Sequence, residues 1–176
     1  ELKLMAGLCG EIKVHDFKSD LAFSHDQSDL PMWREIYCNA FPTFESMACV
    51  KKDGWAQRGG IDRVITLQSG KTITVDEKVR RKDYGDVLLE YWSNRDKKIQ
   101  GWIAKDLACD FIAYAFLPSR RCYMLPFHQL RLAWKRQGPS WVKKYKKTEA
   151  INSGYVTVGV AVPINVIMQA IADATI

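Results

Sequence analysis

Hydrophobic positions near the carboxyl end of the sequence follow two periods in succession. Four valines alternate with other residues, as in a strand with one buried face: Val156, Val158, Val160 and Val162. After Pro163, four apolar residues recur at helical spacing: Ile164, Ile167, Met168 and Ile171. Residues 154–172 carry no formal charge and approach the length of a membrane span. The change of period nevertheless predicts a strand followed by an amphipathic helix, and no contact with a membrane.

The helical period also opens the patterned part of the chain. Asp29 is placed to cap a helix that has Pro31 in its first turn. Four residues then share one helical face: Trp33, Ile36, Tyr37 and Ala40. Pro42 should end this helix. Residues 1–28 have a mixed pattern, and we expect them to form an N-terminal extension to which no element is assigned.

Between these two ends, runs rich in β-branched and aromatic residues predict a series of short strands. The predicted strands cover residues 46–51, 61–67, 72–79, 86–92, 110–117 and 122–125. The remaining segments predict a turn, a loop and two helices: residues 52–54, 57–60, 101–107 and 126–136. The second of these helices has Leu130 and Trp134 on one side. This order predicts a mixed α/β fold in a single domain over residues 1–176.

The composition of the chain indicates its cellular compartment and the class of its partner. The chain has 176 residues, of which 47% are hydrophobic and 26% charged, as expected for one folded domain. Its net charge of +6 attracts polyanions, so nucleic acid is the first expected partner. Five widely spaced cysteines without a CxxC pair, and the lack of a signal-peptide pattern, predict free thiols and disfavour zinc. They favour a reducing compartment such as the cytoplasm.

The residues that carry chemistry lie in the predicted hairpin of residues 61–79. A two-residue loop at its turn would mix apolar and charged residues on both faces. A three-residue loop, with Gly70 in the left-handed conformation, pairs Asp62 with Asp76 and sorts the two faces. The apolar face then holds Ile61, Ile65, Ile73, Val75 and Val79. The polar face holds Asp62, Thr66, Thr72, Thr74, Asp76 and Lys78.

This polar face predicts a metal site. Two carboxylates directly opposite each other on antiparallel strands repel unless a cation lies between them. Mg²⁺, for which Mn²⁺ can substitute, prefers oxygen ligands and would remove the repulsion between Asp62 and Asp76. Lys78 projects to the same face, where it can orient or deprotonate an attacking water or neutralise charge on a phosphate. The pattern therefore predicts hydrolysis of a phosphodiester.

The same residues resemble the PD-(D/E)XK nuclease superfamily, which includes restriction enzymes, Holliday-junction resolvases and phage exonucleases. Asp62 and the triplet Asp76-Glu77-Lys78 carry the resemblance, and Gln57 opens a stretch similar to the Q-x-x-G-x-D approach of some members. Ile61 replaces the proline of the family name. The resemblance implies a restriction-endonuclease-like core, with a central mixed sheet, a β-hairpin that carries the acidic site, and flanking helices. The core would cover residues 29–125, and residues 126–176 would add a basic helical segment, a strand and a helix.

The resemblance also implies a role for each residue of the motif. Asp62, Asp76 and the carbonyl of Glu77 would bind one or two Mg²⁺ ions, and Lys78 would serve the attacking water. Many members carry a glutamate on the helix before the first strand. Glu35 is so placed, although a solvated surface position explains it equally well.

Three further acids have open assignments. Glu45 competes with Glu35 for the same role. Asp86 and Glu90 lie on the predicted strand after the hairpin, where they would either extend the acidic site or occupy an exposed strand face.

Basic residues are expected to contact the phosphates of nucleic acid. Four of them flank the acidic motif: Arg58, Lys71, Arg80 and Arg81. Six more lie in a stretch of residues 131–147 that has no acid: Lys135, Arg136, Lys143, Lys144, Lys146 and Lys147. Trp134, Trp141 and Tyr145 interleave with them and would either stack on bases or pack in the core.

The sequence therefore predicts an enzyme, a Mg²⁺-dependent deoxyribonuclease in which a metal-activated water cleaves DNA. Two alternatives remain: a nucleic-acid-binding or protein-interaction module of the same fold without activity, and a nuclease directed at RNA. A homodimer is an option, because cutting two strands usually needs two sites. The resemblance suggests a phage or host-defence setting.

Overall fold

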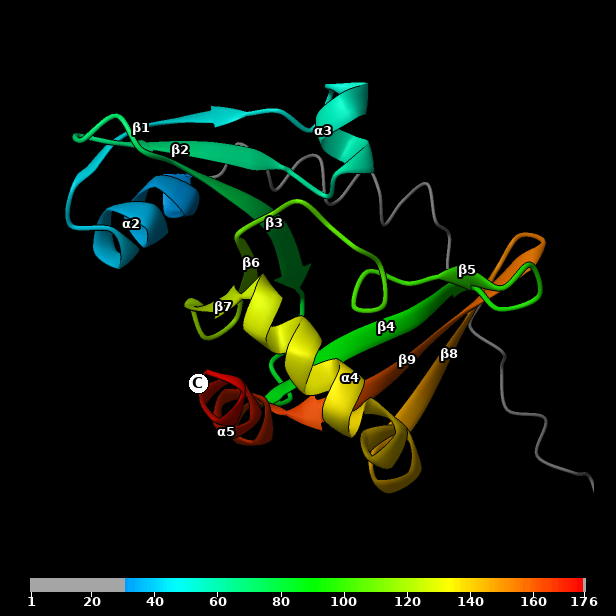
Figure 1. The fold of residues 1–176 in the computed structure, drawn as a ribbon. Coiled ribbons are helices and arrows are strands. Elements are labelled where there is room, and N and C mark those ends of the chain that lie inside the picture. Colours follow the sequence, from blue (N-terminus) through cyan, green and yellow to red (C-terminus); the bar gives the residue numbers. More distant parts are fainter. Residues whose placement is uncertain (1–30, 176) are drawn as a thin grey trace, which may run out of the picture.

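The computed structural model describes residues 31–175, which form two β-sheets and several helices in a mixed α/β fold (Figure 1). The predicted extension over residues 1–28, and the predicted helix cap Asp29, lie outside the described residues. The helices are α2 (Pro31–Ala40), α3 (Gly54–Arg58), α4 (Phe127–Lys144) and α5 (Ile164–Ala174).

The first sheet is mixed and has the strand order β1-β2-β3-β6-β7. Its strands are β1 (Phe44–Cys49), β2 (Arg63–Leu67), β3 (Thr72–Arg80), β6 (Phe111–Phe116) and β7 (Arg121–Pro126). Neighbours are antiparallel except for the central pair β3 and β6, which is parallel. A mixed sheet flanked by helices was predicted, and the structure confirms it.

The second sheet is antiparallel and has the order β5-β4-β9-β8. Its strands are β4 (Asp86–Asn94), β5 (Ile99–Gln100), β8 (Lys146–Asn152) and β9 (Tyr155–Pro163). The chain enters this sheet directly after β3, returns to the first sheet with β6 and β7, and comes back through α4 with β8 and β9. Residues just after β3 therefore lie between the two sheets, as Figure 1 shows.

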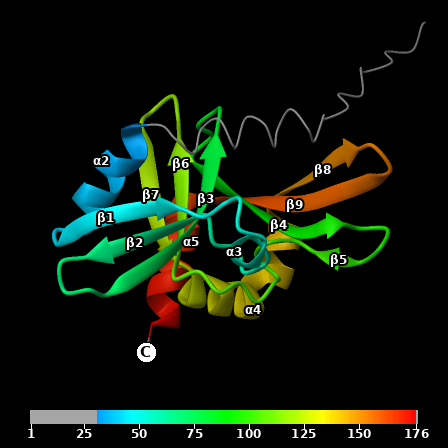
Figure 2. The ribbon, with the colours of Figure 1, turned by 90° about the horizontal axis from the view of Figure 1, so that it is seen from above.

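Side chains on the two faces of the first sheet belong to two separate apolar clusters. On one face, Trp33 and Tyr37 of α2 pack with Ile65, Val75 and Ala113. On the other face, residues of β6 such as Ile112 and Tyr114 pack with α4, α5 and the second sheet. Figure 2 shows α2 and α4 on opposite sides of this sheet. β3 and β6 are therefore covered on both faces.

The carboxyl-terminal strand and helix are confirmed by β9 and α5. Val158, Val160 and Val162 are buried, and so are Ile167 and Ile171. Val160, Val162, Ile167 and Ile171 form part of the larger cluster, so the segment acts as a core layer. No helix within residues 31–175 combines the length and the apolar character that crossing a membrane would require.

Several local predictions were wrong. Residues 101–107 form turns without a helix, held by N–H groups of Ala104 and Lys105 that donate to the Gly101 carbonyl at 3.1 Å. Helix α3 spans Gly54–Arg58, where a turn was predicted at residues 52–54 and a loop at residues 57–60, because the Asp53 side chain accepts from the first N–H groups of that helix. The strand β8 was not predicted at all.

The basic helix continues further than its pattern suggested. It was predicted to end at residue 136, but α4 runs to Lys144 and contains Pro139. Trp141 is buried and lies 6.3 Å, ring to ring, from Trp134 on the preceding turns. Burial of this second tryptophan stabilises the helix beyond Gly138 and Pro139, which local propensity disfavours.

Candidate functional site

The hairpin β2–β3 has the register that the sorting of faces predicted. Gly70 has a φ of +79°, and the Leu67 N–H donates to the Lys71 carbonyl at 2.9 Å across the three-residue loop. Val64 pairs with Thr74 and Thr66 with Thr72. The Asp62 N–H donates to the Val75 carbonyl at 2.8 Å, which extends the ladder beyond β2. Asp62 and Asp76 are therefore neighbours across the two strands.

One residue of the predicted apolar face lies elsewhere. Ile61 was expected beside Ile65, but it packs in the cluster on the other face. Gly60 has a φ of +67°, and the Ile61 N–H donates to the Ala56 carbonyl at 2.9 Å. The chain is still turning there, so the alternation of the strand does not apply.

Asp76 and Lys78 face each other on the polar side of β3. The Lys78 Nζ donates to Asp76 Oδ1 at 2.7 Å. Asp76 is only 4% exposed, whereas the Asp62 side chain is 23% exposed. The Lys78 ammonium also lies 5.9 Å from the ring centre of Trp102. The side chains of Asp62, Asp76 and Lys78 form a compact group of two carboxylates and one cation, which we call the Asp76 site.

Burial and neighbouring charges set the protonation of the Asp76 site. Burial raises the pKa of Asp76 to about 6, with the Asp62 carboxylate adding to the rise and Lys78 opposing it. Burial lowers the pKa of Lys78, but the carboxylates of Asp76 and Asp62 raise it more, so the net shift is upward. Lys78 is therefore an ammonium ion at neutral pH, a donor of protons and of positive charge.

The Asp76 site opens into a cavity of about 600 Å³ between the two sheets. Gln57 and Arg58 of α3 line one part of it, and Arg80 at the end of β3 lines another. The far wall comes from the second sheet and from the segment after it, through Glu90 and Lys105. The cavity is thus lined by both signs of charge.

Glu90 of β4 contributes a third carboxylate to this cavity. Burial raises the pKa of Glu90, and the cations Lys78 and Lys105 hold it down in part. Of the two assignments left open for this residue, the structure favours extension of the acidic site over an exposed strand face. Asp86 does not line this cavity.

The Glu77 side chain points away from the cavity of the Asp76 site and lies on the opposite face of the first sheet. It is fully buried and accepts a hydrogen bond from the Tyr37 hydroxyl at 2.8 Å. The Arg63 Nε donates to the same oxygen, Oε1, at 2.5 Å, and the Lys51 Nζ lies 3.2 Å from Oε2. We call these four residues the Glu77 cluster.

The backbone of Glu77 nevertheless belongs to the Asp76 site. Its N–H donates to Asp62 Oδ2 at 2.8 Å. Since the N–H and C=O of one strand residue point to the same side, the Glu77 carbonyl also faces the side of Asp62. The carbonyl and the side chain of Glu77 thus serve different surroundings, and metal binding by the carbonyl stays a prediction of the resemblance.

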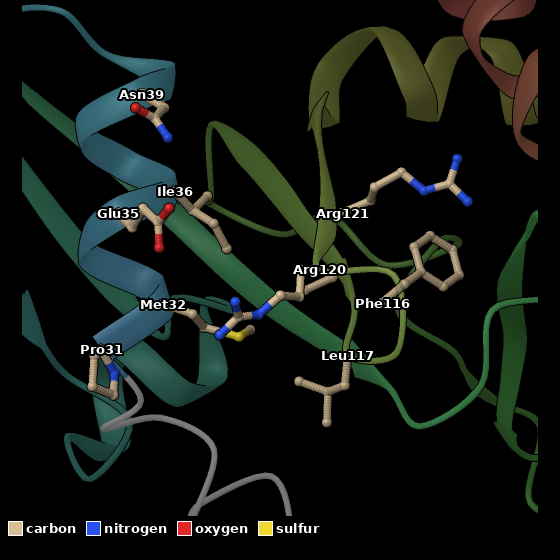
Figure 3. A pocket seen from close by; sticks show the side chains of 10 residues that line it. Pro31, Met32, Glu35, Ile36, Asn39, Phe116, Leu117, Arg120 and Arg121 are labelled. Atoms are coloured by element: carbon tan, nitrogen blue, oxygen red, sulfur yellow. The ribbon is translucent and has the colours of Figure 1, made fainter.

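Glu35 is not brought to the Asp76 site. It lines a separate cavity of about 450 Å³ between α2 and the turn that joins β6 to β7. Figure 3 shows Glu35 and Asn39 on α2, with Arg120 reaching in from that turn. The helix reaches the acidic strand through Tyr37 instead, two residues further along. Glu45, the competing acid, is exposed on β1 and does not line the cavity of the Asp76 site.

The predicted basic residues fall into separate groups. Arg58 and Arg80 line the cavity of the Asp76 site, while Lys71 is exposed at the hairpin tip and Arg81 in the loop after β3. Lys135 and Lys143 line a depression along α4. The others are distributed over the second half of α4 and the start of β8: Arg136, Lys144, Lys146 and Lys147.

Three of those outer residues already have partners within the chain. Arg136 Nη1 donates to the Asp173 carbonyl at 3.5 Å. The Lys147 Nζ lies 2.8 Å from Glu149 Oε1, and the Lys144 ammonium lies 5.3 Å from the Tyr145 ring centre. Trp141 is in the core, and Trp134 stacks on Tyr91 with 5.8 Å between ring centres. Of the two readings given for the tryptophans of residues 131–147, packing in the core applies.

Three residues around the Asp76 site were not identified from the sequence. Lys51 follows β1, and Trp102 and Lys105 lie in the turns that were mistaken for a helix. No spacing relates them to the hairpin, because tertiary packing alone brings these segments together. The alternation in β4 that directs Val87 and Leu89 inward did offer a signal for Glu90.

The donor set suits a hard divalent cation. Mg²⁺ usually binds through one or two carboxylates and keeps its other positions for water and substrate phosphate. Asp62, Asp76 and the Glu77 carbonyl supply oxygen donors of this kind. Within residues 31–175, no group of three or more His, Cys, Asp or Glu side chains is arranged to hold a metal.

No family model matches the chain, and neither a curated protein nor a solved structure matches it.

Proposed function

We propose that the protein is a Mg²⁺-dependent deoxyribonuclease of the PD-(D/E)XK type with a restriction-endonuclease-like core. The observation that carries the proposal is the Asp76 site. Asp62 lies across the hairpin from Asp76, and the Lys78 ammonium lies 2.7 Å from Asp76 Oδ1. Paired acids beside a lysine, on a hairpin in a mixed sheet flanked by helices, are what the resemblance implies for such an enzyme.

The acids would hold the metal. Asp62 and Asp76, with the carbonyl of Glu77, would bind Mg²⁺ when it is present. The ion would supply Lewis acidity toward a phosphate oxygen and lower the pKa of the attacking water. Burial of Asp76, together with the Asp62 charge, already makes its ionised form costly, so a divalent cation gains from neutralising the pair.

Lys78 would act on the phosphate and the nucleophile. Since its pKa is raised, it enters the reaction as an ammonium ion. It can hydrogen-bond the attacking water and stabilise charge that develops on the phosphorane oxygens. Asp76 and the Trp102 ring hold its position. Arg58 and Arg80, which line the same cavity, would neutralise the neighbouring phosphates of the strand.

DNA cleavage with and without Mg²⁺ tests the proposal. The purified chain should cut plasmid or linear DNA in Mg²⁺ or Mn²⁺ and lose the activity in a chelator. Asp76→Asn and Lys78→Met should each reduce the cleavage rate by about 100-fold or more. Lys97→Met, in the exposed turn between β4 and β5, is the matched control for removal of one positive charge. Cleavage by either site variant at the rate of the parent would refute the assignment.

The same assay separates the alternatives. A binding module of the same fold would retain DNA affinity that falls with salt, but would not cleave with any metal. An RNA-directed nuclease would cut RNA and leave DNA intact at equal metal concentration. Both substrates are therefore assayed side by side.

A further inference from the structure

The Glu77 cluster is a buried ionic group that the proposed chemistry does not use. It lies on the reverse face of β3 and combines two cations, a carboxylate and a phenol: Lys51, Arg63, Glu77 and Tyr37. Lys51 is 8% exposed and Tyr37 is fully buried. Groups of this kind must be hydrogen-bonded to be tolerated in a core, and these are. Its position directly behind the acidic residues requires an explanation.

Lys51 connects the cluster to the Asp76 site. Its Nζ lies 3.2 Å from Glu77 Oε2 and 3.8 Å from Asp62 Oδ2. The backbone follows the same connection, because the N–H of Val50 donates to the Asp62 carbonyl at 2.9 Å. Asp62, the first residue of the acidic motif, is thus held by the segment after β1 through both its backbone and its side chain.

These contacts restrict the Asp62 carboxylate to one orientation. Its Oδ2 atom receives the Glu77 N–H at 2.8 Å and faces the Lys51 ammonium. Oδ1 is engaged by neither of these two donors. Rotation of the Asp62 carboxylate would move Oδ2 away from both donors. The two donors therefore fix which Asp62 oxygen can turn toward a cation shared with Asp76.

We propose that Lys51 is a positioning residue, which orients the Asp62 carboxylate for metal binding and is itself held by Glu77. This inference rests on the proposed function, since it concerns the metal that the nuclease would use. Lys51 acts through Asp62 and does not touch the substrate. In this arrangement the side chain of Glu77 serves the site from behind, while its carbonyl serves the site directly.

Electrostatics and positioning predict opposite results when Lys51 is removed. A lysine 3.8 Å from a carboxylate competes with a divalent cation for the same charge. If Lys51 acted by charge alone, Lys51→Met would tighten metal binding. If Lys51 positions Asp62, the same substitution weakens metal binding, because the carboxylate can turn away. The sign of the change therefore distinguishes the two.

Titration with Mn²⁺ in a calorimeter measures this sign without any substrate. We expect Lys51→Met to bind Mn²⁺ about 10-fold more weakly, the lower range for loss of a residue that orients a metal ligand. Lys51→Arg, which keeps a cation and its donors, should restore part of the affinity. The charge-balanced pair K51M/E77Q is measured alongside, because K51M alone deprives a buried carboxylate of one partner. Lys52→Met, at the exposed neighbouring position, is the matched control.

The outcomes separate this inference from the proposed function. Affinity for Mn²⁺ that is unchanged or higher in folded K51M or K51M/E77Q overturns the positioning role, whether or not the parent cleaves DNA. A parent that binds Mn²⁺ but cuts no nucleic acid refutes the nuclease, and the K51M titration still decides the role of Lys51. A parent that binds no Mn²⁺ refutes both.

Discussion

Glu77→Ala and Asp76→Asn should have opposite effects on stability, although the two residues are adjacent in β3. Glu77 is the centre of its buried cluster, with three donors to one carboxylate. Asp76 is buried beside one partner, Lys78, with the like charge of Asp62 nearby. The alternation of a strand places them on different faces, one in the core behind the sheet and one at the cavity.

The cost of Glu77→Ala can be assembled from its contacts. The Tyr37 hydroxyl, fully buried, loses its acceptor, which costs about 1–3 kcal/mol. Lys51 and Arg63 lose the carboxylate that balances their charge, and breaking a buried ion pair costs about 3–5 kcal/mol. Native proteins are stable by only about 5–15 kcal/mol, so E77A should lose at least about a quarter of that margin and unfold at a lower urea concentration than the parent.

Asp76→Asn should leave the free energy of unfolding unchanged or increase it. The pKa of Asp76 is raised to about 6, above its ordinary value, so ionisation at neutral pH is opposed by the folded state. A neutral amide of the same shape removes that opposition.

Urea denaturation followed by tryptophan fluorescence at pH 7.5 measures both variants against the parent. Glu77→Gln separates the two contributions, because the amide oxygen still accepts from Tyr37 and only the charge that balances Lys51 and Arg63 is lost. The reasoning is refuted if the free energies of unfolding of E77A and the parent differ by less than about 1 kcal/mol, because an ordinary surface substitution causes a change of that order. It is equally refuted if D76N is the less stable of the two.

Three further predictions concern other parts of the fold. A Cβ at Gly101 would lie 2.2 Å from the Glu90 carbonyl oxygen, so Gly101→Ala should lower the free energy of unfolding by about 1–3 kcal/mol in the same urea assay. Equal stability would contradict the close packing of Gly101 against Glu90. Burial raises the pKa of Cys109 and Cys122 to about 12, so iodoacetamide at pH 8 should spare both in the folded chain. Mass spectrometry that finds either alkylated would contradict these raised pKa values. Protonated Asp76 cannot bind a cation, so at a Mg²⁺ concentration well below saturation cleavage should fall as the pH drops from 7 to 5. Its metal-free pKa of about 6 is the upper bound for the midpoint, because bound Mg²⁺ favours the carboxylate, and a flat profile would contradict the role of this carboxylate.

Local patterns determined most of the strands, and the hairpin most completely. The sorting of apolar and polar residues allowed only one register for β2 and β3, and that register places Asp62 opposite Asp76. Strong periodicity in β9 and α5 was equally informative. In both cases the pattern extends over enough residues to exclude the competing period.

The errors lie where a single contact decides the structure. α3 depends on the cap supplied by Asp53, in a stretch that otherwise contains turn residues. β8 has few apolar residues of its own and exists because β9 supplies its hydrogen-bonding partner. The sequence of β8 therefore carries little signal without its neighbour.

The composition of the site was only half predictable for the same reason. Asp62, Asp76 and Lys78 come from one local hairpin, so strand geometry alone relates them. Lys51, Trp102 and Lys105 approach from segments that local spacing does not connect to that hairpin. Glu35 was named for its place in the chain, but the direction of its side chain depends on how α2 packs on the sheet.

The parallel pairing of β3 with β6 implies an order in which the acidic residues meet. The turn at Gly70 joins β2 and β3 locally, whereas β6 begins about 30 residues after β3 ends. Short loops close before long ones, so the two aspartates would come together in the nascent chain while water still surrounds them. Lys78 is then already present as a counter-charge two residues away, and the hairpin can form before any partner strand or ion arrives.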